Sequence, residues 1–167
     1  MNIEALFTLP VGTRFETSGP VVTRDLIRSA SDLCGFAKAP HIVGERSLLS
    51  LSLGLDEGAC LCGAGTLCLM NAALERAIAI DEQYDVLSFK QDAVFTAPNL
   101  EGGEMSFSFV VIEAKRSVFP PRSTGKKVPM SRIVLECEAW NSRVGRILGK
   151  PVLKATWTLG YVAMAHV

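Results

Sequence analysis

The stretch that most constrains the fold is Gly63–Ile80, which reads Gly-Ala-Gly-Thr-Leu-Cys-Leu-Met-Asn-Ala-Ala-Leu-Glu-Arg-Ala-Ile-Ala-Ile. Small residues begin it, and apolar residues then occupy nearly every face of the helix that this run predicts. A surface helix has one apolar stripe, whereas a helix that is apolar almost all round is buried on most sides. The chain from Tyr84 onward reads as strands. We therefore expect an α+β protein in which an antiparallel sheet wraps around a central buried helix.

The composition excludes several classes of partner. We expect a single domain over residues 1–167, because this length buries one sizeable core. Seventeen basic and seventeen acidic residues cancel, so neither nucleic acid nor a membrane surface is an expected partner. The N-terminus lacks the basic region and apolar core of a signal peptide, and the apolar run Ala59–Leu74 is short for a membrane span. We expect a cytoplasmic protein.

The cysteines and histidines do not form a metal-binding pattern. The odd number of cysteines argues against a complete disulfide framework. Cys60 and Cys62 are separated by one residue, whereas zinc pairs are usually separated by about two to four. His41 is the only internal histidine, because His166 is next to last in the chain. We expect no structural metal and no cofactor.

The segment before the central helix contains a capped helix followed by a loop. Thr23 is a typical N-cap residue, and apolar residues at helical spacing predict a helix over Arg24–Cys34. Gly35 ends this helix as a left-handed cap, and Pro40 makes Gly35–His41 a loop. Gly44–Leu55 fits either a short helix or an irregular apolar segment. A short peripheral strand is expected over Thr13–Ser18.

Four long stretches after the central helix alternate apolar and polar residues or are otherwise typical of strands. They are Val86–Phe95, Met105–Val118, Ile133–Asn141 and Val152–Ala163. Turn residues at Pro98-Asn99 and Gly102-Gly103 separate the first two, and Phe119–Pro129 and Ser142–Lys150 read as loops. Consecutive strands joined in this way are expected to pair antiparallel.

This order of elements resembles the hot-dog fold, and three short motifs resemble its MaoC-like branch of (R)-specific enoyl-thioester hydratases and dehydratases. Val11-Gly12 with Val22–Ile27 resembles the opening Val-Gly and helix start of that family. Gly35–His41 has the spacing of its loop Gly-Asp-x-Asn-Pro-x-His. Phe95–Pro98 with Gly102–Glu104 resembles its Phe-x-x-Pro…Gly-Asp turn. The resemblance implies an acyl thioester of coenzyme A or acyl carrier protein as ligand, and a homodimer or a heterodimer with a related chain.

The sequence departs from the family pattern at the catalytic loop. Phe36 stands at the position of the catalytic Asp, Lys38 at that of the Asn and Ala39 at that of the Pro, and only His41 is retained. The His-Gly step before the central helix reads Ala64-Gly65. One partner of the family's acid–base pair is therefore absent if Phe36 occupies the implied position.

The resemblance implies roles for the remaining candidate residues. His41 would act as acid or base, and the Gly65 amide at the start of the helix would donate to the enolate oxygen. Phe36 and Lys38 would contact substrate. Asp32, one helical turn before Phe36, is the better candidate for a replacement carboxylate, and Glu45 is the other. The alternatives are an ordinary structural histidine, exposed acids, and glycines that only permit a tight chain entry.

Three functions remain open at this stage. The first is hydratase or dehydratase chemistry with His41 as acid/base. The second is a non-catalytic acyl-binding subunit, in which a paired hot-dog chain supplies the missing acid. The third is a thioesterase on the same fold. The basic residues around Phe119–Pro129 fit either a rim for an anionic carrier or a solvated loop, and both tryptophans are expected in the core or a dimer interface.

Overall fold

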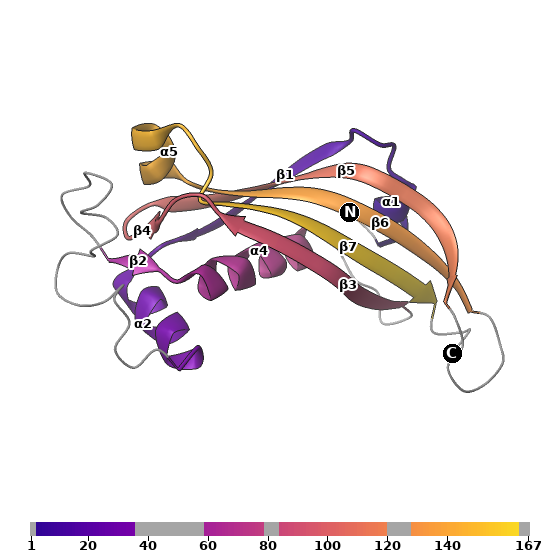
Figure 1. Cartoon of the computed structure of the whole chain (residues 1–167), viewed down its shortest axis with the longest axis horizontal. Helices are drawn as coiled ribbons and strands as arrows, with labels where there is room; N and C mark the ends of the chain where they lie inside the picture. The colour runs from indigo at the N-terminus through magenta and orange to yellow at the C-terminus, as the bar shows by residue number, and fades with distance from the viewer. Residues whose placement is uncertain (1–2, 36–58, 79–83, 120–127, 164–167) are drawn as a thin grey trace.

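The computed structural model describes residues 3–35, 59–78, 84–119 and 128–163, and these form a curved antiparallel sheet that bends over one long helix (Figure 1). The five strands lie in the order β1-β5-β6-β7-β3, and every neighbouring pair is antiparallel, as predicted. Their bounds are Arg14–Val21 for β1, Tyr84–Phe95 for β3, Glu104–Phe119 for β5, Val128–Asn141 for β6 and Leu153–Ala163 for β7. A separate pair of two-residue strands joins β2 (Cys60–Leu61) to β4 (Asn99–Leu100).

Helix α2 (Arg24–Leu33) begins where its sequence predicts. The Thr23 hydroxyl accepts a hydrogen bond from the Leu26 amide at 3.2 Å, which caps the first turn. Cys34 is the C-terminal cap, and Gly35 follows with φ +71°, a conformation that glycine adopts at little cost.

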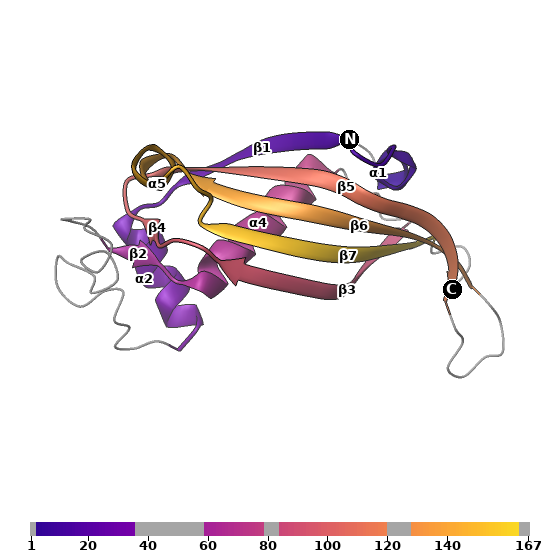
Figure 2. The ribbon, with the colours of Figure 1, turned by 45° about the horizontal axis from the view of Figure 1, so that its top comes forward.

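Helix α4 (Gly63–Ala77) lies under the sheet, as predicted for the central helix (Figure 2). Most of its side chains are buried or half-buried, and Gly65, Met70 and Leu74 are among the buried ones. The exposed residues include Ala64, Cys68 and Glu75, which lie along one stripe of the helix. This stripe stays exposed in the single chain, because a single sheet covers only one side of a helix.

The helix-facing side of the sheet supplies most of the core. On β5 and β6 the predicted alternation is confirmed, and the buried residues are Phe107, Phe109, Val111, Ile133, Leu135, Cys137 and Ala139. On β3 it is wrong, because Phe89 and Phe95 are both about half exposed. Strand β3 lies at the sheet edge, and its register with β7 shifts between Ser88 and Lys90. Such an irregularity changes the face on which later side chains lie.

Two helices were not expected from the sequence. The predicted loop Ser142–Lys150 contains α5 (Ser142–Leu148), because Asn141 Oδ1 accepts from two amides of its first turn and Gly149 ends it at φ 61°. Helix α1 (Ile3–Thr8) packs against the sheet, where the Phe7 ring stacks on Tyr161 at 5.1 Å between centroids.

Strand β6 starts at Val128, inside the predicted loop Phe119–Pro129. Gly44–Leu55 and residues 120–127 lie outside the described residues.

Candidate functional site at the start of helix α4

The start of α4 is capped by Cys62, a role that sequence analysis did not predict. Cys62 is buried and occupies the N-cap position, and its Sγ accepts a hydrogen bond from the Gly65 amide at 3.3 Å. Its carbonyl accepts from the Thr66 amide at 3.0 Å. Sulfur is a weak acceptor. Among the residues that the structure describes, none accepts a hydrogen bond from the amides of Gly63 or Ala64.

The two glycines of this first turn allow close packing from both sides. A Cβ atom on Gly65 would lie 2.9 Å from Leu61 Cδ1 and 3.0 Å from Ala30 Cβ. A Cβ atom on Gly63 would lie 2.7 Å from the Phe95 ring. The interpretation of these glycines as residues that permit a tight approach is therefore supported. A donor role for Gly65 requires a ligand oxygen to replace the Cys62 sulfur as acceptor.

A buried network of amide side chains supports the same turn. Asn141 Nδ2 donates to Asn99 Oδ1 at 2.8 Å, and Asn99 Nδ2 donates to Thr66 Oγ1 at 3.1 Å. Thr66 Oγ1 in turn donates to the Cys62 carbonyl at 3.2 Å. All three network side chains, those of Asn141, Asn99 and Thr66, are buried. Buried polar groups that are fully paired fix a unique arrangement, so this network sets the position of the first α4 turn.

The structure describes only two of the predicted site residues. Gly65 is buried in the first turn of α4, and Asp32 is exposed near the end of α2. The two helices are in contact at Ala30 and Gly65, so the end of α2 lies near the start of α4. Phe36, Lys38, His41 and Glu45 lie outside the described residues, and their roles stay predictions.

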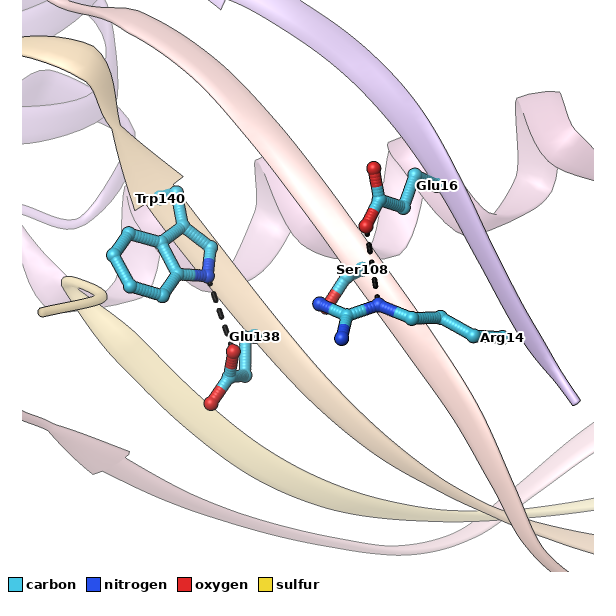
Figure 3. Close-up of polar contacts among 5 residues, drawn as sticks. All are labelled: Arg14, Glu16, Ser108, Glu138 and Trp140. Atoms are coloured by element: carbon cyan, nitrogen blue, oxygen red, sulfur yellow. Dashed lines mark hydrogen bonds and ion pairs between the residues drawn. The ribbon is translucent and has the colours of Figure 1, made fainter. Parts of the chain in front are cut away.

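Polar side chains on the opposite face of the sheet form a second group (Figure 3). Arg14 donates to Glu16 at 3.1 Å and to Ser108 at 3.2 Å, while Glu138 accepts from Trp140 at 3.1 Å and pairs with Lys154 at 2.9 Å. Desolvation raises the pKa of Glu138, but the hydrogen bonds from Lys154 and Trp140 outweigh it and hold that pKa below its usual value. These polar side chains form hydrogen bonds and ion pairs with one another, so we interpret them as a group that stabilises the sheet. Trp140 belongs to it, whereas Trp157 is buried as expected and donates to Ser88 at 2.7 Å.

The basic residues expected near the loop at 119–129 are only partly described. Lys115 pairs with Glu113 at 2.6 Å, and its hydrogen bond lowers the pKa of that carboxyl group. Arg122, Lys126 and Lys127 lie outside the described residues. A basic rim for an anionic carrier therefore stays a prediction. None of the described helices is long and apolar enough to cross a membrane.

Comparison with known proteins identifies the fold. No protein-family model and no curated protein matches the sequence. The MaoC-like dehydratase from Rhodospirillum rubrum superimposes with a TM-score of 0.65 at 18% identity, over 98% of this chain and 97% of that one. The R-hydratase PhaJ1 from Pseudomonas aeruginosa gives 0.59 at 18% identity, over 93% and 82%. The chain has the hot-dog fold. The fluoroacetyl-CoA thioesterase FlK shares this hot-dog arrangement, with a TM-score of 0.57 at 14% identity over 94% and 90% of the two chains.

Two parts of the candidate site correspond to only weak signals in the sequence. Cys62 directly precedes the small residues that begin α4, which is the place of an N-cap, although cysteine is not a usual capping residue. Asn99 begins strand β4 and Asn141 ends strand β6, and a polar residue is ordinary at either end of a strand. Their mutual contact joins positions 42 residues apart, and no local pattern encodes it.

Proposed function

We propose that this chain binds an acyl thioester, of coenzyme A or of acyl carrier protein, with its thioester carbonyl at the start of α4. The observation that carries this proposal is the first turn of that helix. The Gly65 amide there has only a sulfur acceptor, and the preceding two amides have no described acceptor. Amides at a helix N-terminus stabilise a developing oxyanion. Structural neighbours named as hydratases, dehydratases and an acyl-CoA thioesterase support this class of ligand.

The favoured chemistry is addition of water to an enoyl thioester, or its reverse. Hydration requires a base that activates water, an acid that protonates the α carbon, and donors to the enolate oxygen. His41 is the proposed acid/base, and the α4 amides are the proposed donors, with Gly65 among them. Asp32 is the proposed carboxylate, because it lies at the end of the helix that meets α4 and precedes the predicted loop. Phe36 and Lys38 are proposed to line the acyl thioester.

Two alternatives use the same binding site. The first is a thioesterase, which would activate water for attack on the carbonyl carbon. The structural similarity to the fluoroacetyl-CoA thioesterase supports this alternative. A non-catalytic subunit would bind the acyl chain while a second hot-dog chain supplies the carboxylate that Phe36 lacks. The two enzymes differ in product, so one assay separates them, and the non-catalytic subunit forms neither product.

The test incubates the purified protein with crotonyl-CoA and follows both loss of the enoyl double bond and release of free coenzyme A thiol. Loss of the double bond without thiol release identifies the hydratase, and thiol release identifies the thioesterase. We expect His41→Ala to lower kcat by about 10²–10⁴-fold for hydration while folding is retained, since one positioned acid–base group supplies this factor. Asp25→Asn, an exposed acid in the first turn of α2, is the matched control for Asp32→Asn.

The Phe36→Asp variant separates the enzyme from the binding subunit. Binding of crotonyl-CoA without turnover by the wild type, together with gain of hydration in Phe36→Asp, supports the subunit. Loss of an existing activity in Phe36→Asp means that the aromatic ring belongs to a working pocket. Absence of both binding and turnover with every acyl-CoA contradicts the proposed ligand class.

A further inference from the structure

Two cysteines, Cys34 and Cys62, cap the helix ends that lie against each other, Cys34 at the end of α2 and Cys62 at the start of α4. The contact between the helices is close, because a Cβ atom on Gly65 would lie 3.0 Å from Ala30 Cβ. Cys34 lies one helical turn beyond Ala30, and its amide donates to the Ala30 carbonyl at 3.1 Å. Cys62 lies one turn before Gly65 and accepts its amide at 3.3 Å. The helix contact therefore places both thiols at the same junction.

The electrostatics of Cys34 agree with this placement. Desolvation, the neighbouring Cys62 and a hydrogen bond with it, and more weakly Cys68, raise the pKa of the Cys34 thiol. Cys34 is exposed and Cys62 is buried, so an outside reagent reaches one member of the pair first. Among the described residues, no group of three or more His, Cys, Asp and Glu side chains is arranged to hold a metal ion.

We propose that Cys34 and Cys62 form a reversible intramolecular disulfide when the protein meets a small disulfide such as oxidised glutathione. The Cys34 thiolate attacks one sulfur of oxidised glutathione, which releases one reduced glutathione and leaves a mixed disulfide. The Cys62 thiolate then attacks the Cys34 sulfur and releases the second glutathione. The protein loses two protons and two electrons, and the oxidant gains them as two thiols.

The disulfide would tie the end of α2 to the N-cap of α4 and close residues 35–61 into a loop. Closing a loop of this length removes entropy from the unfolded chain, so the apparent Tm of the oxidised protein is expected to rise by roughly 5–10 °C. The raised pKa of the Cys34 thiol leaves little thiolate at neutral pH, so oxidation is expected to be slow there and to become faster as the pH rises, because the thiolate is the nucleophile. Buried Cys137 is a poorer candidate. Burial raises the pKa of the Cys137 thiol to about 12.

The experiment treats the native protein with oxidised glutathione, alkylates the remaining thiols, and maps the linked peptides by mass spectrometry. The expected result is a Cys34–Cys62 linkage that dithiothreitol reverses, with two fewer free thiols than in the reduced protein. Cys68→Ser is the matched control and should retain the linkage. Cys62→Ser should stop at the mixed glutathione disulfide on Cys34.

Three results would overturn the proposal. One is a Cys34–Cys68 linkage in the wild type. Another is stable glutathionylation of Cys34 while Cys62 stays a free thiol. The third is a native protein that stays unmodified under oxidising conditions that do link Cys34 and Cys62 in the urea-unfolded chain. That result would mean that the native structure holds the two thiols apart.

Discussion

Asn99 Nδ2 donates a hydrogen bond to Thr66 Oγ1 at 3.1 Å and thereby joins the short strand β4 to the first turn of α4. Asn141, at the end of β6, holds Asn99 from the other side at 2.8 Å. The position of the proposed oxyanion donors therefore depends on side chains from two distant parts of the sheet. Their removal is expected to affect the site through the helix.

Asn141→Ala should be strongly destabilising. The side chain donates to Asn99 and to the Leu100 carbonyl, and it caps α5 by accepting from two amides. Loss of these bonds leaves buried partners unpaired, so we expect the free energy of unfolding in urea to fall by about 3 kcal/mol or more. Asn71→Ala is the control, because the side chain of Asn71 accepts a single hydrogen bond among the described residues, from Gln91, and about 1 kcal/mol or less is expected. Equal costs for the two variants would show that the network contributes no more than a surface pair.

Gly65→Ala should destabilise the junction between α2 and α4. Its Cβ atom would lie too close to Ala30 Cβ and Leu61 Cδ1, and overpacking of this kind costs about 1–3 kcal/mol. The double variant Gly65→Ala with Ala30→Gly should recover part of the loss. Gly145→Ala in α5 is the control, since its nearest described neighbour, Trp140, would be 3.6 Å away and alanine favours helix. Thermal denaturation of the wild type and the three variants measures the difference in stability. A Gly65→Ala variant as stable as the wild type would contradict the close packing.

Glu138→Gln should lower stability at neutral pH and have no effect in acid. The pKa of Glu138 is lowered in the folded protein, so its contribution is fully present above the unfolded pKa and is lost as pH falls through the folded value. We expect the variant to be less stable than the wild type by about 0.5–1 kcal/mol at pH 7, and this difference should disappear once the pH falls below the folded pKa of Glu138. Glu16→Gln, which removes a more exposed pair with Arg14, should cost less. A difference that persists unchanged in strong acid would mean that the charge of Glu138 is not its source.

The protein is expected to be a dimer in solution. Strand β3 is a sheet edge, and Val94 and Phe95 on it are 64% and 52% exposed. An apolar edge strand is normally covered by another strand or chain. Light scattering should give about twice the chain mass of 18.0 kDa, and Val94→Asp should shift the protein toward the monomer while Ile147→Asp on α5 should not. A wild-type monomer at micromolar concentration would contradict this expectation.

The parts of the fold that sequence analysis predicted are those with local or periodic signals. Thr23 and Gly35 mark the ends of α2 through contacts with residues next to them. Strands β5 and β6 alternate because one face covers α4 and the other does not. Helix α5 was not predicted, because Gly149 was interpreted as a loop residue, whereas it is the left-handed cap that ends this helix.

The candidate site was harder to predict, because its supports are not local. The Cys62–Gly65 hydrogen bond and the Asn141–Asn99–Thr66 network depend on how β4 and β6 meet α4. The orientation of Phe89 and Phe95 likewise depends on the register shift against β7. A single sequence contains none of this information in a readable pattern.

The central claim is that an acyl thioester binds at the start of α4, and hydrogen exchange with mass spectrometry tests it most directly. The protein is compared with and without saturating crotonyl-CoA, and with free coenzyme A as a reference. The account predicts that crotonyl-CoA protects the peptide covering Gly63 and Ala64 more than free coenzyme A does, while peptides covering Glu138 and Trp140 on the opposite face do not change. Saturable binding that leaves the Gly63–Ala64 amides unprotected and protects the opposite face instead would contradict the account.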